Sequence, residues 1–219
     1  MHPYCPLAAG HGAIGISAAK VSEAEALVKA GIDGILITSP VVTEHKIARL
    51  MTLLQRAPDL MVVVDSTANA CQLNDACRQA NLTLTCLVDI DPGVHRTGVS
   101  YTEAQGFART IHNHTHLNLA GLQCYAGNLH HIATFEARQE ASTKAMTQAA
   151  AVRRQLLEAG LPCPILTGTG TGTFDIDSAI DGVTEIQPGS YTVMDQEYAN
   201  IEGCDQQPFR GCRETSING

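Results

Sequence analysis

Short apolar runs alternate with longer amphipathic segments along most of the chain. Seven of the apolar runs predict strands, at 13–19, 34–38, 60–65, 82–90, 117–125, 164–166 and 183–186. Apolar positions at helical spacing predict helices between them, at 22–29, 44–56, 68–79, 102–112 and 135–159. Because strands that alternate with helices form parallel sheets with right-handed crossovers, the pattern predicts an α/β fold.

Capping signals predict where some of these helices begin and end. Ser22, with Glu25 three residues later, predicts a capping box, and Gly31 predicts the end of the same helix. Thr102 with Gln105 predicts a second capping box.

Polar and glycine residues follow the carboxyl ends of the predicted strands. They are Lys20, Asp65, Asp89, Asp91, Arg96, Tyr125, 169–173 and Ser190. Both (β/α)8 barrels and open doubly wound sheets bind ligands at that end. No Gly-x-Gly-x-x-Gly opens an early strand–helix turn, and the glycine-rich loop follows a late strand, as in phosphate-binding barrels. The pattern therefore favours a (β/α)8 barrel that is one strand short of closure.

Residues 167–173 read Thr-Gly-Thr-Gly-Thr-Gly-Thr. Such a density of glycines disfavours helix and strand because each glycine costs backbone entropy. Glycines let backbone N–H groups converge and threonine hydroxyls add donors, so the loop suits an anion such as phosphate. The alternative is a tight surface turn.

A loop between Val88 and Gly98 carries Arg96. A guanidinium there could donate two parallel bonds to an oxyanion or a phenolate oxygen. The alternative is a structural clamp in which Arg96 pairs with Asp89 or Asp91.

A strand ending at Tyr125 leads into a pair of histidines, His130 and His131. The tyrosine could stack on a planar cofactor, and a histidine could move protons. The alternative is a tyrosine that caps the barrel, with at least one histidine facing solvent.

The segment 185–191 supplies further donors. The N–H groups of Gly189 and Ser190 and the hydroxyls of Ser190 and Tyr191 could bind phosphate, and Gln187 could face a ring nitrogen. Together with 167–173, this segment predicts two anion-binding turns on adjacent strands.

Two other features suggest chemistry less strongly. His112, His114 and His116 resemble a metal cluster, but alternate residues point different ways and no carboxylate or cysteine joins them, so no metal site is predicted. Lys20 is read as a surface lysine, with a Schiff-base role as the alternative.

Composition excludes some classes of partner. The net charge of −8 argues against nucleic acid and anionic membranes, and no apolar run is long enough to span a membrane. The amino terminus lacks the basic start and apolar core of a signal peptide. The eight cysteines include no Cys-x-x-Cys, and free thiols in a reducing cytoplasm explain them better than disulfides or zinc.

Taken together, these segments resemble the fold-type III pyridoxal-phosphate (PLP) enzymes, in the D-threonine aldolase and D-serine dehydratase-like branch. The resemblance covers about residues 12–198, and the matching stretches are 18–25, 89–98, 121–127, 170–175 and 184–195. It implies a barrel of the alanine racemase N-terminal kind with PLP in its mouth. It also implies a lyase that cleaves or dehydrates a D-configured β-hydroxy amino acid.

The resemblance also implies roles for individual residues. Arg96 would contact the ring oxygen of the cofactor, Tyr125 would lie beside the ring and Gln187 would lie near the pyridine nitrogen. The phosphate would be held by Gly170, Thr171, Gly172, Thr173, Gly189, Ser190 and Tyr191.

The chain departs from the family pattern at both ends. The Schiff-base lysine of the family ends a strand that would precede residue 12, and Lys20 aligns with a different position. No catalytic residue is therefore assigned. The family's β-domain, with its metal-binding histidine and cysteine, should follow Asp195, so no metal ligand is assigned either. We expect an incomplete barrel domain over 1–198 and an irregular tail over 199–219.

Several alternatives stay open. The chain could be a non-catalytic PLP- or phosphate-binding remnant, an amino-acid racemase of the same fold, a sugar-phosphate barrel enzyme or a product with no stable fold. We expect a small D-amino acid as substrate, a cytoplasmic location and, as a guess from related enzymes, a homodimer.

Overall fold

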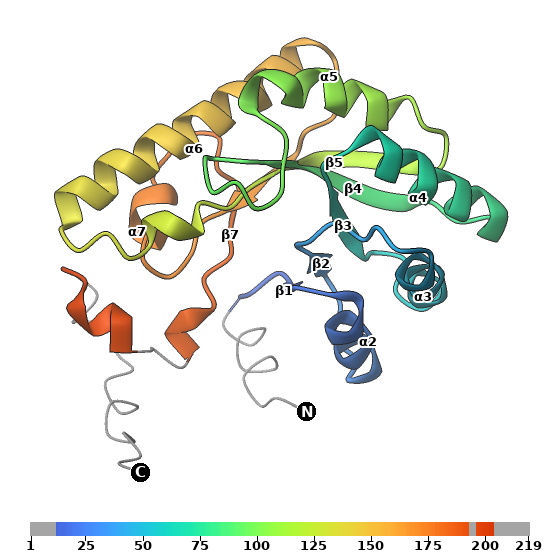
Figure 1. Ribbon diagram of the computed structural model, residues 1–219, viewed down its shortest axis with the longest axis horizontal. Helices are drawn as coiled ribbons and strands as arrows, with labels where there is room; N and C mark the ends of the chain where they lie inside the picture. The colour runs from blue at the N-terminus through green and yellow to red at the C-terminus, as the bar shows by residue number, and fades with distance from the viewer. Residues whose placement is uncertain (1–11, 193–195, 204–219) are drawn as a thin grey trace.

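Seven parallel strands form one curled sheet within the part of the chain that the computed structural model describes, residues 12–192 and 196–203. The strands pair in chain order, as Figure 1 shows. They are β1 (Ile16–Ala18), β2 (Ile35–Ile37), β3 (Met61–Val64), β4 (Leu84–Ile90), β5 (Leu117–Cys124), β6 (Ile165–Gly168) and β7 (Glu185–Ile186). All seven predicted strands are confirmed.

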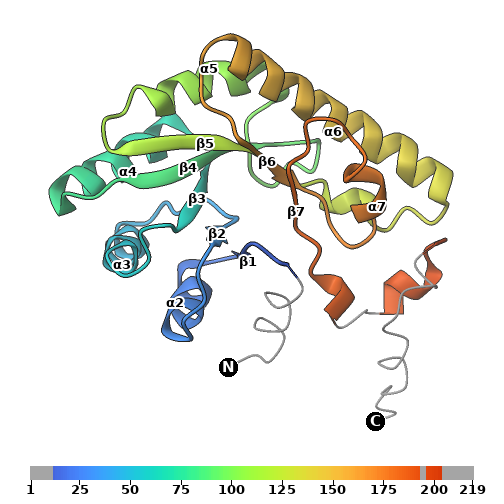
Figure 2. The same ribbon diagram turned by 180° about the vertical axis from the view of Figure 1, so that it is seen from behind.

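Helices cover the outer, convex face of this sheet (Figures 1 and 2). They are α2 (Val21–Lys29), α3 (Glu44–Leu54), α4 (Thr67–Ala80), α5 (Tyr101–His112), α6 (Phe135–Glu158) and the short α7 (Phe174–Asp177). Three short 3-10 helices lie beyond strand ends: η1 (Gly127–Leu129), η2 (Ser190–Thr192) and η3 (Gln196–Asn200). The α/β fold is therefore confirmed as a curled half-barrel.

The two faces of the sheet have separate apolar clusters because successive residues of a strand point to opposite faces. Val62 and Val64 of β3 belong to the main core under the helices. Val63 belongs to a smaller cluster with Leu36 and Leu87, on the opposite face. The interior of the half-barrel is thus apolar at this level, and its polar groups lie nearer the carboxyl ends of the strands.

The sheet has two edges among the described residues, at β1 and β7. Each edge strand pairs with one neighbour, β2 or β6. Ile14, beside β1, is 77% exposed and Ile186, in β7, is 40% exposed. The prediction of a barrel short of closure agrees with this arrangement.

Both predicted capping boxes are wrong. Helix α2 begins at Val21 with no side-chain cap, which places Ser22 inside the helix, and Glu23 accepts from the Ala19 N–H instead. The N-cap of α5 is Ser100, two residues before the predicted Thr102, and Ser100 and Glu103 form the box. The end of α2 was predicted better than its start, since Gly31 follows the helix with a φ of +74°.

We expect the substitution Ser100→Ala to lower the free energy of unfolding by about 1 kcal/mol, because the Glu103 N–H loses its cap. Ser22→Ala is the matched control and should change stability by less than about 0.5 kcal/mol, because Ser22 is an exposed helical residue that caps nothing. Urea unfolding of the two variants measures both effects. Equal losses would contradict the assigned helix starts.

Candidate functional site

A hydrogen-bonded network of two glutamine amides and one buried carboxylate crosses the inside of the half-barrel near the carboxyl ends of its strands. The Gln123 Nε2 group donates to Asp89 Oδ1 at 2.9 Å and to the Thr38 carbonyl at 3.3 Å. The Gln187 Nε2 group donates to Thr167 Oγ1 at 3.0 Å and to Gln123 Oε1 at 3.4 Å. Strands from β2 to β7 are thereby joined through side chains as well as through their backbone ladder.

Asp89 is the ionisable residue of this hydrogen-bonded network and is 3% exposed. Burial raises the pKa of its carboxyl group above the ordinary value, although hydrogen bonds from Gln123 and Thr97 act in the opposite direction. The nearby Asp65 raises this pKa further, while Arg96 opposes it. A polar environment with one buried carboxylate thus lies near the carboxyl ends of β4 and β5.

The loop that carries Arg96 is organised by Asp91. Its Oδ1 accepts from the N–H groups of Gly93, Val94 and His95 at 2.9, 2.7 and 3.0 Å. Partial burial would raise the pKa of Asp91, but these backbone hydrogen bonds outweigh it and hold the pKa below its ordinary value. The loop is therefore held by its own backbone, and the carboxylate of Asp91 is satisfied there.

Arg96 lies beside Tyr125 in the structure. Its guanidinium carbon is 5.6 Å from the centre of the Tyr125 ring, within the range of a cation–π contact. Among the described residues no ion pair joins Arg96 to Asp89 or Asp91. The structural-clamp alternative therefore has no support.

The hydroxyls of the glycine loop are largely engaged by a buried carboxylate. Asp177 accepts from Thr169 Oγ1 at 3.0 Å and from Ser142 Oγ at 2.6 Å. Burial raises the pKa of Asp177, and hydrogen bonds from Ser142, Thr173 and Thr169 act against that rise. The side chains of Thr169 and Thr173 thus point inward, and the Thr173 N–H donates to the Gly170 carbonyl at 3.1 Å. Within the described residues, the loop N–H groups left for a ligand are those of Thr171 and Gly172.

The glycines of this loop are also required by close packing. A Cβ atom at Gly168 would overlap the Cys124 carbonyl oxygen. Cβ atoms at Gly170 and Gly172 would overlap the ring and the carbonyl oxygen of His130. The alternating glycines therefore let β6 and its loop lie directly against β5 and the segment after it.

The two predicted anion-binding turns are in contact. The Tyr191 N–H donates to Thr171 Oγ1 at 3.1 Å, and the Gln187 N–H donates to the Gly168 carbonyl at 2.9 Å. Gly189 is exposed, and a Cβ atom there would meet nothing within 4 Å. The structure thus brings the turns together at one end of the sheet, with open space at Gly189.

Arg138 is a residue of this region that sequence reasoning missed. It is 2% exposed, and its guanidinium donates to the carbonyl oxygens of Gly172, Ile132 and Glu202 at 2.8, 2.8 and 2.6 Å. It therefore ties the glycine loop to α6 and to the segment 196–203. No local motif marked it, because its partners are backbone groups that are distant in sequence.

The two histidines after Tyr125 differ in environment. His130 is 3% exposed and its ring meets that of Tyr125 edge-on, with centroids 5.2 Å apart. The side chain of His131 is 41% exposed, and its Nε2 lies 3.5 Å from Glu197 Oε2. His131 is the more exposed of the two, so a proton-transferring histidine remains a prediction for His131.

The other candidate groups lie apart from one another. The His114 Nε2 is 4.0 Å from Cys71 Sγ, and the His116 Nδ1 is 3.1 Å from the Leu82 carbonyl oxygen. In residues 12–192 and 196–203, no three histidine, cysteine or acidic side chains are arranged to hold a metal ion.

Lys20 follows β1 and its side chain is 63% exposed. Its Nζ lies 3.6 Å from a carboxylate oxygen of Glu23, one helical turn away. This is the environment of a surface lysine.

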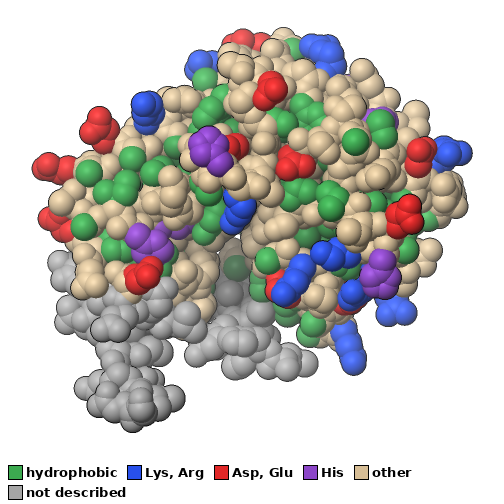
Figure 3. Space-filling model, viewed as in Figure 1, with side chains coloured by type: hydrophobic (Ala, Val, Ile, Leu, Met, Phe, Trp, Pro, Cys, Tyr) green, Lys and Arg blue, Asp and Glu red, His purple; other side chains and the backbone are tan. Residues whose placement is uncertain are grey.

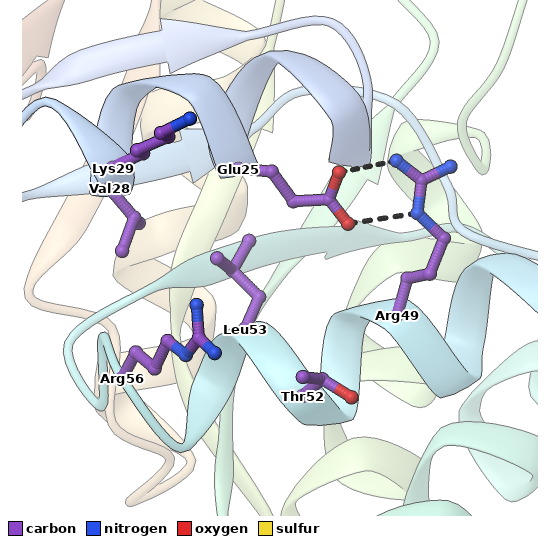
Figure 4. A pocket seen from close by; sticks show the side chains of 7 residues that line it. All are labelled: Glu25, Val28, Lys29, Arg49, Thr52, Leu53 and Arg56. Atoms are coloured by element: carbon purple, nitrogen blue, oxygen red, sulfur yellow. Dashed lines mark hydrogen bonds and ion pairs between the residues drawn. The ribbon is translucent and has the colours of Figure 1, made fainter.

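A separate cavity lies between α2 and α3, lined by Glu25, Val28, Lys29, Arg49, Thr52, Leu53 and Arg56 (Figure 4). Glu25 and Arg49 face one another there in a two-bonded ion pair. Lys and Arg side chains gather over these helices in Figure 3. Because the helices run opposite to the strands, the ends that carry Lys29 and Arg56 lie at the amino ends of the strands, away from the mouth.

Comparison with known proteins identifies the family. The family model for the alanine racemase N-terminal domain matches residues 1–197. The chain belongs to this family. As an alanine racemase N-terminal domain, it carries Arg96, Tyr125 and the two contacting turns at the carboxyl ends of its strands.

The chain is 39% identical over 192 residues to a D-threonine aldolase from Arthrobacter sp., covering 87% of this chain and 50% of that protein. The crystal structure of D-threonine aldolase from Filomicrobium marinum has a TM-score of 0.84 at 34% identity, over 90% of this chain and 54% of that one. D-threo-3-hydroxyaspartate dehydratase from Delftia sp. HT23 has a TM-score of 0.77 at 32% identity, over 91% and 54%. This domain therefore spans about half the length of its relatives.

Asp177→Asn should remove a pH-dependent part of the stability. Burial raises the pKa of Asp177 in the folded state, so the native protein binds the proton more tightly than the unfolded chain does. The contribution of Asp177 is therefore complete below the ordinary aspartate pKa of about 3.9 and falls as the pH rises above it. Unfolding free energies should show wild type losing stability, relative to Asp177→Asn, as the pH rises above this value.

The control for this comparison is Asp181→Asn, since Asp181 is exposed and is not among the groups that shift the pKa of Asp177. This substitution on the surface should change the free energy of unfolding by less than about 0.5 kcal/mol. A difference between wild type and Asp177→Asn that stays constant with pH would show that the Asp177 carboxyl group titrates normally.

Proposed function

We propose that this chain forms the PLP-binding part of a lyase that acts on D-configured β-hydroxy amino acids. The observation that carries the proposal is the meeting of three predicted elements at the carboxyl ends of β4 to β7. Arg96 lies against Tyr125, and the 189–191 turn bonds to Thr171 of the glycine loop. These are the groups that a planar ring with an anionic tail requires.

The residues present fit this cofactor. The backbone of the glycine loop, with Gly189 and Ser190, would hold the phosphate, and the guanidinium of Arg96 would donate to the ring oxygen. Tyr125 would lie beside the ring. Gln187 already donates its amide N–H to Thr167 and Gln123, which leaves its carbonyl oxygen to face the ring nitrogen. When bound, PLP would supply the electron sink that bond cleavage at the substrate requires.

The substrate class comes from the relatives. D-Threonine and D-threo-3-hydroxyaspartate, in the names of two of them, are both D-configured amino acids with a hydroxyl on the β-carbon. One relative is named an aldolase and the other a dehydratase, so both aldol cleavage and dehydration fit the proposal. The fold also serves alanine racemases, but those neighbours are only 16% identical and support the fold alone.

A cytoplasmic location is part of the same proposal. The five cysteines in the described residues are free, and four of them are buried. Burial raises the pKa of Cys77 to about 11 and that of Cys124 to about 12, which keeps these thiols protonated and unreactive. No helix in the described residues is both long and apolar enough to cross a membrane.

PLP binding tests the proposal directly. We expect Arg96→Ala to weaken PLP affinity by about tenfold or more, because a charge-assisted hydrogen bond is lost. Arg56→Ala is the control, since Arg56 lines the cavity between α2 and α3. Equilibrium dialysis measures both affinities. Absence of PLP binding by the wild type, or equal affinities for wild type and Arg96→Ala, would contradict the proposed site.

Activity tests the interpretation of Lys20. We expect this polypeptide, incubated with PLP and D-threonine, to release little or no acetaldehyde, because Lys20 is exposed and paired with Glu23. The Lys20→Ala variant should behave like the wild type. Robust release that disappears in Lys20→Ala would show that Lys20 carries the cofactor after all.

A further inference from the structure

His130 is wedged between Tyr125 and the glycine loop. Only 3% of the residue is exposed, and its ring lies where a Cβ atom of Gly170 would be. Its carbonyl oxygen likewise occupies the place of a Cβ atom at Gly172. The backbone of the glycine loop thus packs directly against His130 at both Gly170 and Gly172.

The ring of His130 also has an unsatisfied nitrogen. Its Nε2 is covered from solvent and has no hydrogen-bond partner among the described residues. A buried polar atom without a partner costs roughly 1–3 kcal/mol, so proteins seldom keep one without a use for it. The nitrogen is therefore available to a group that the glycine loop would hold.

The imidazole is neutral in this environment. Burial, and secondarily His131, lowers the pKa of His130 to about 4. A neutral imidazole has one N–H donor, which either ring nitrogen can carry. A half turn of the ring exchanges the places of Nε2 and Cε1, the ring atom nearest to Gly170. The donor can therefore be presented to the loop without moving the backbone.

We propose that His130 is a ligand-binding residue whose Nε2–H donates to the phosphate group held by the loop Gly170–Thr173. This inference rests on the proposed function and adds a side-chain donor to a loop whose own hydroxyls, at Thr169 and Thr173, are turned towards Asp177. The ligand is a phosphate monoester dianion. The ring of His130 both positions Gly170 and completes the donor set.

NMR of the wild type gives a readout that does not depend on activity. A long-range proton–nitrogen spectrum distinguishes the protonated from the unprotonated nitrogen of each histidine, and the His130 signals are identified by their loss in His130→Gln. Addition of inorganic phosphate, or of PLP, should convert Nε2 to a hydrogen-bonded donor. Unchanged His130 signals on a protein that binds PLP would overturn the inference.

Affinities for PLP and for pyridoxal, which lacks the phosphate, separate this role from a structural one. His130→Phe should weaken PLP binding by about tenfold and change pyridoxal binding by less than about twofold. His130→Gln keeps an N–H donor and should retain most of the PLP affinity. His114→Gln is the control, because His114 lies at the opposite end of the sheet, before β5.

The outcomes are distinguishable. If the wild type binds neither PLP nor inorganic phosphate, the proposed function fails and this inference fails with it. If the wild type binds PLP and His130→Phe loses affinity for PLP and pyridoxal equally, the residue is only structural and the inference alone fails. Where His130→Phe does not fold, the spectrum of the wild type decides.

Discussion

Two buried charges hold the glycine loop from behind, and the candidate site depends on where they place it. Asp177 binds the loop through the hydroxyls of Thr169 and Thr173, and Arg138 binds it through the Gly172 carbonyl. Among the described residues Arg138 forms no ion pair, so neutral groups satisfy it. A buried charge is tolerated only where its hydrogen bonds are made, so both side chains strongly restrict the loop. The position of the loop, whose residues 168–173 are all buried, is fixed as a consequence.

Hydrogen bonds from Asp89 through Gln123 to Gln187 connect the Arg96 loop with the second turn. Asp89 lies at the end of β4, next to the Arg96 loop, while Gln187 follows β7 beside the second turn. A change in the charge of Asp89 would therefore be felt at Gln187. Burial raises the pKa of Asp89, so this carboxyl group is the member of the network whose charge depends most on its surroundings.

The elements that could be predicted from the sequence are those determined by local patterns. Apolar runs located every strand, and glycine with threonine located the loop after β6. The predicted helix starts lie within one residue of the observed ones, but the capping box of α5 was placed two residues too late. Ser100 with Glu103 matches the capping-box spacing as well as Thr102 with Gln105 does, so the spacing alone does not decide between them.

Long-range contacts could not be predicted in the same way. Arg138 bonds to carbonyl oxygens up to 64 residues away, and nothing in its own helix indicates this. The sequence explained the glycines of the loop by the need for N–H groups to approach a ligand. The structure gives a second reason for glycine, because side chains at Gly170 and Gly172 would overlap His130. Steric contacts of this kind leave no periodic signal in the sequence.

The residues of the proposed cofactor site lie at one side of the sheet, and Lys20 lies at the other. Arg96, Tyr125 and the two turns belong to β4–β7, which form one continuous part of the sheet, and their mutual contacts do not involve β1. Lys20 follows β1, at the other edge, and is turned to solvent. Under the proposed function, binding of the ring and phosphate would therefore depend on contacts within β4–β7. Any reaction that needed groups from both edges would also depend on how β1 and β7 are positioned, so affinity and turnover would report on different parts of the fold.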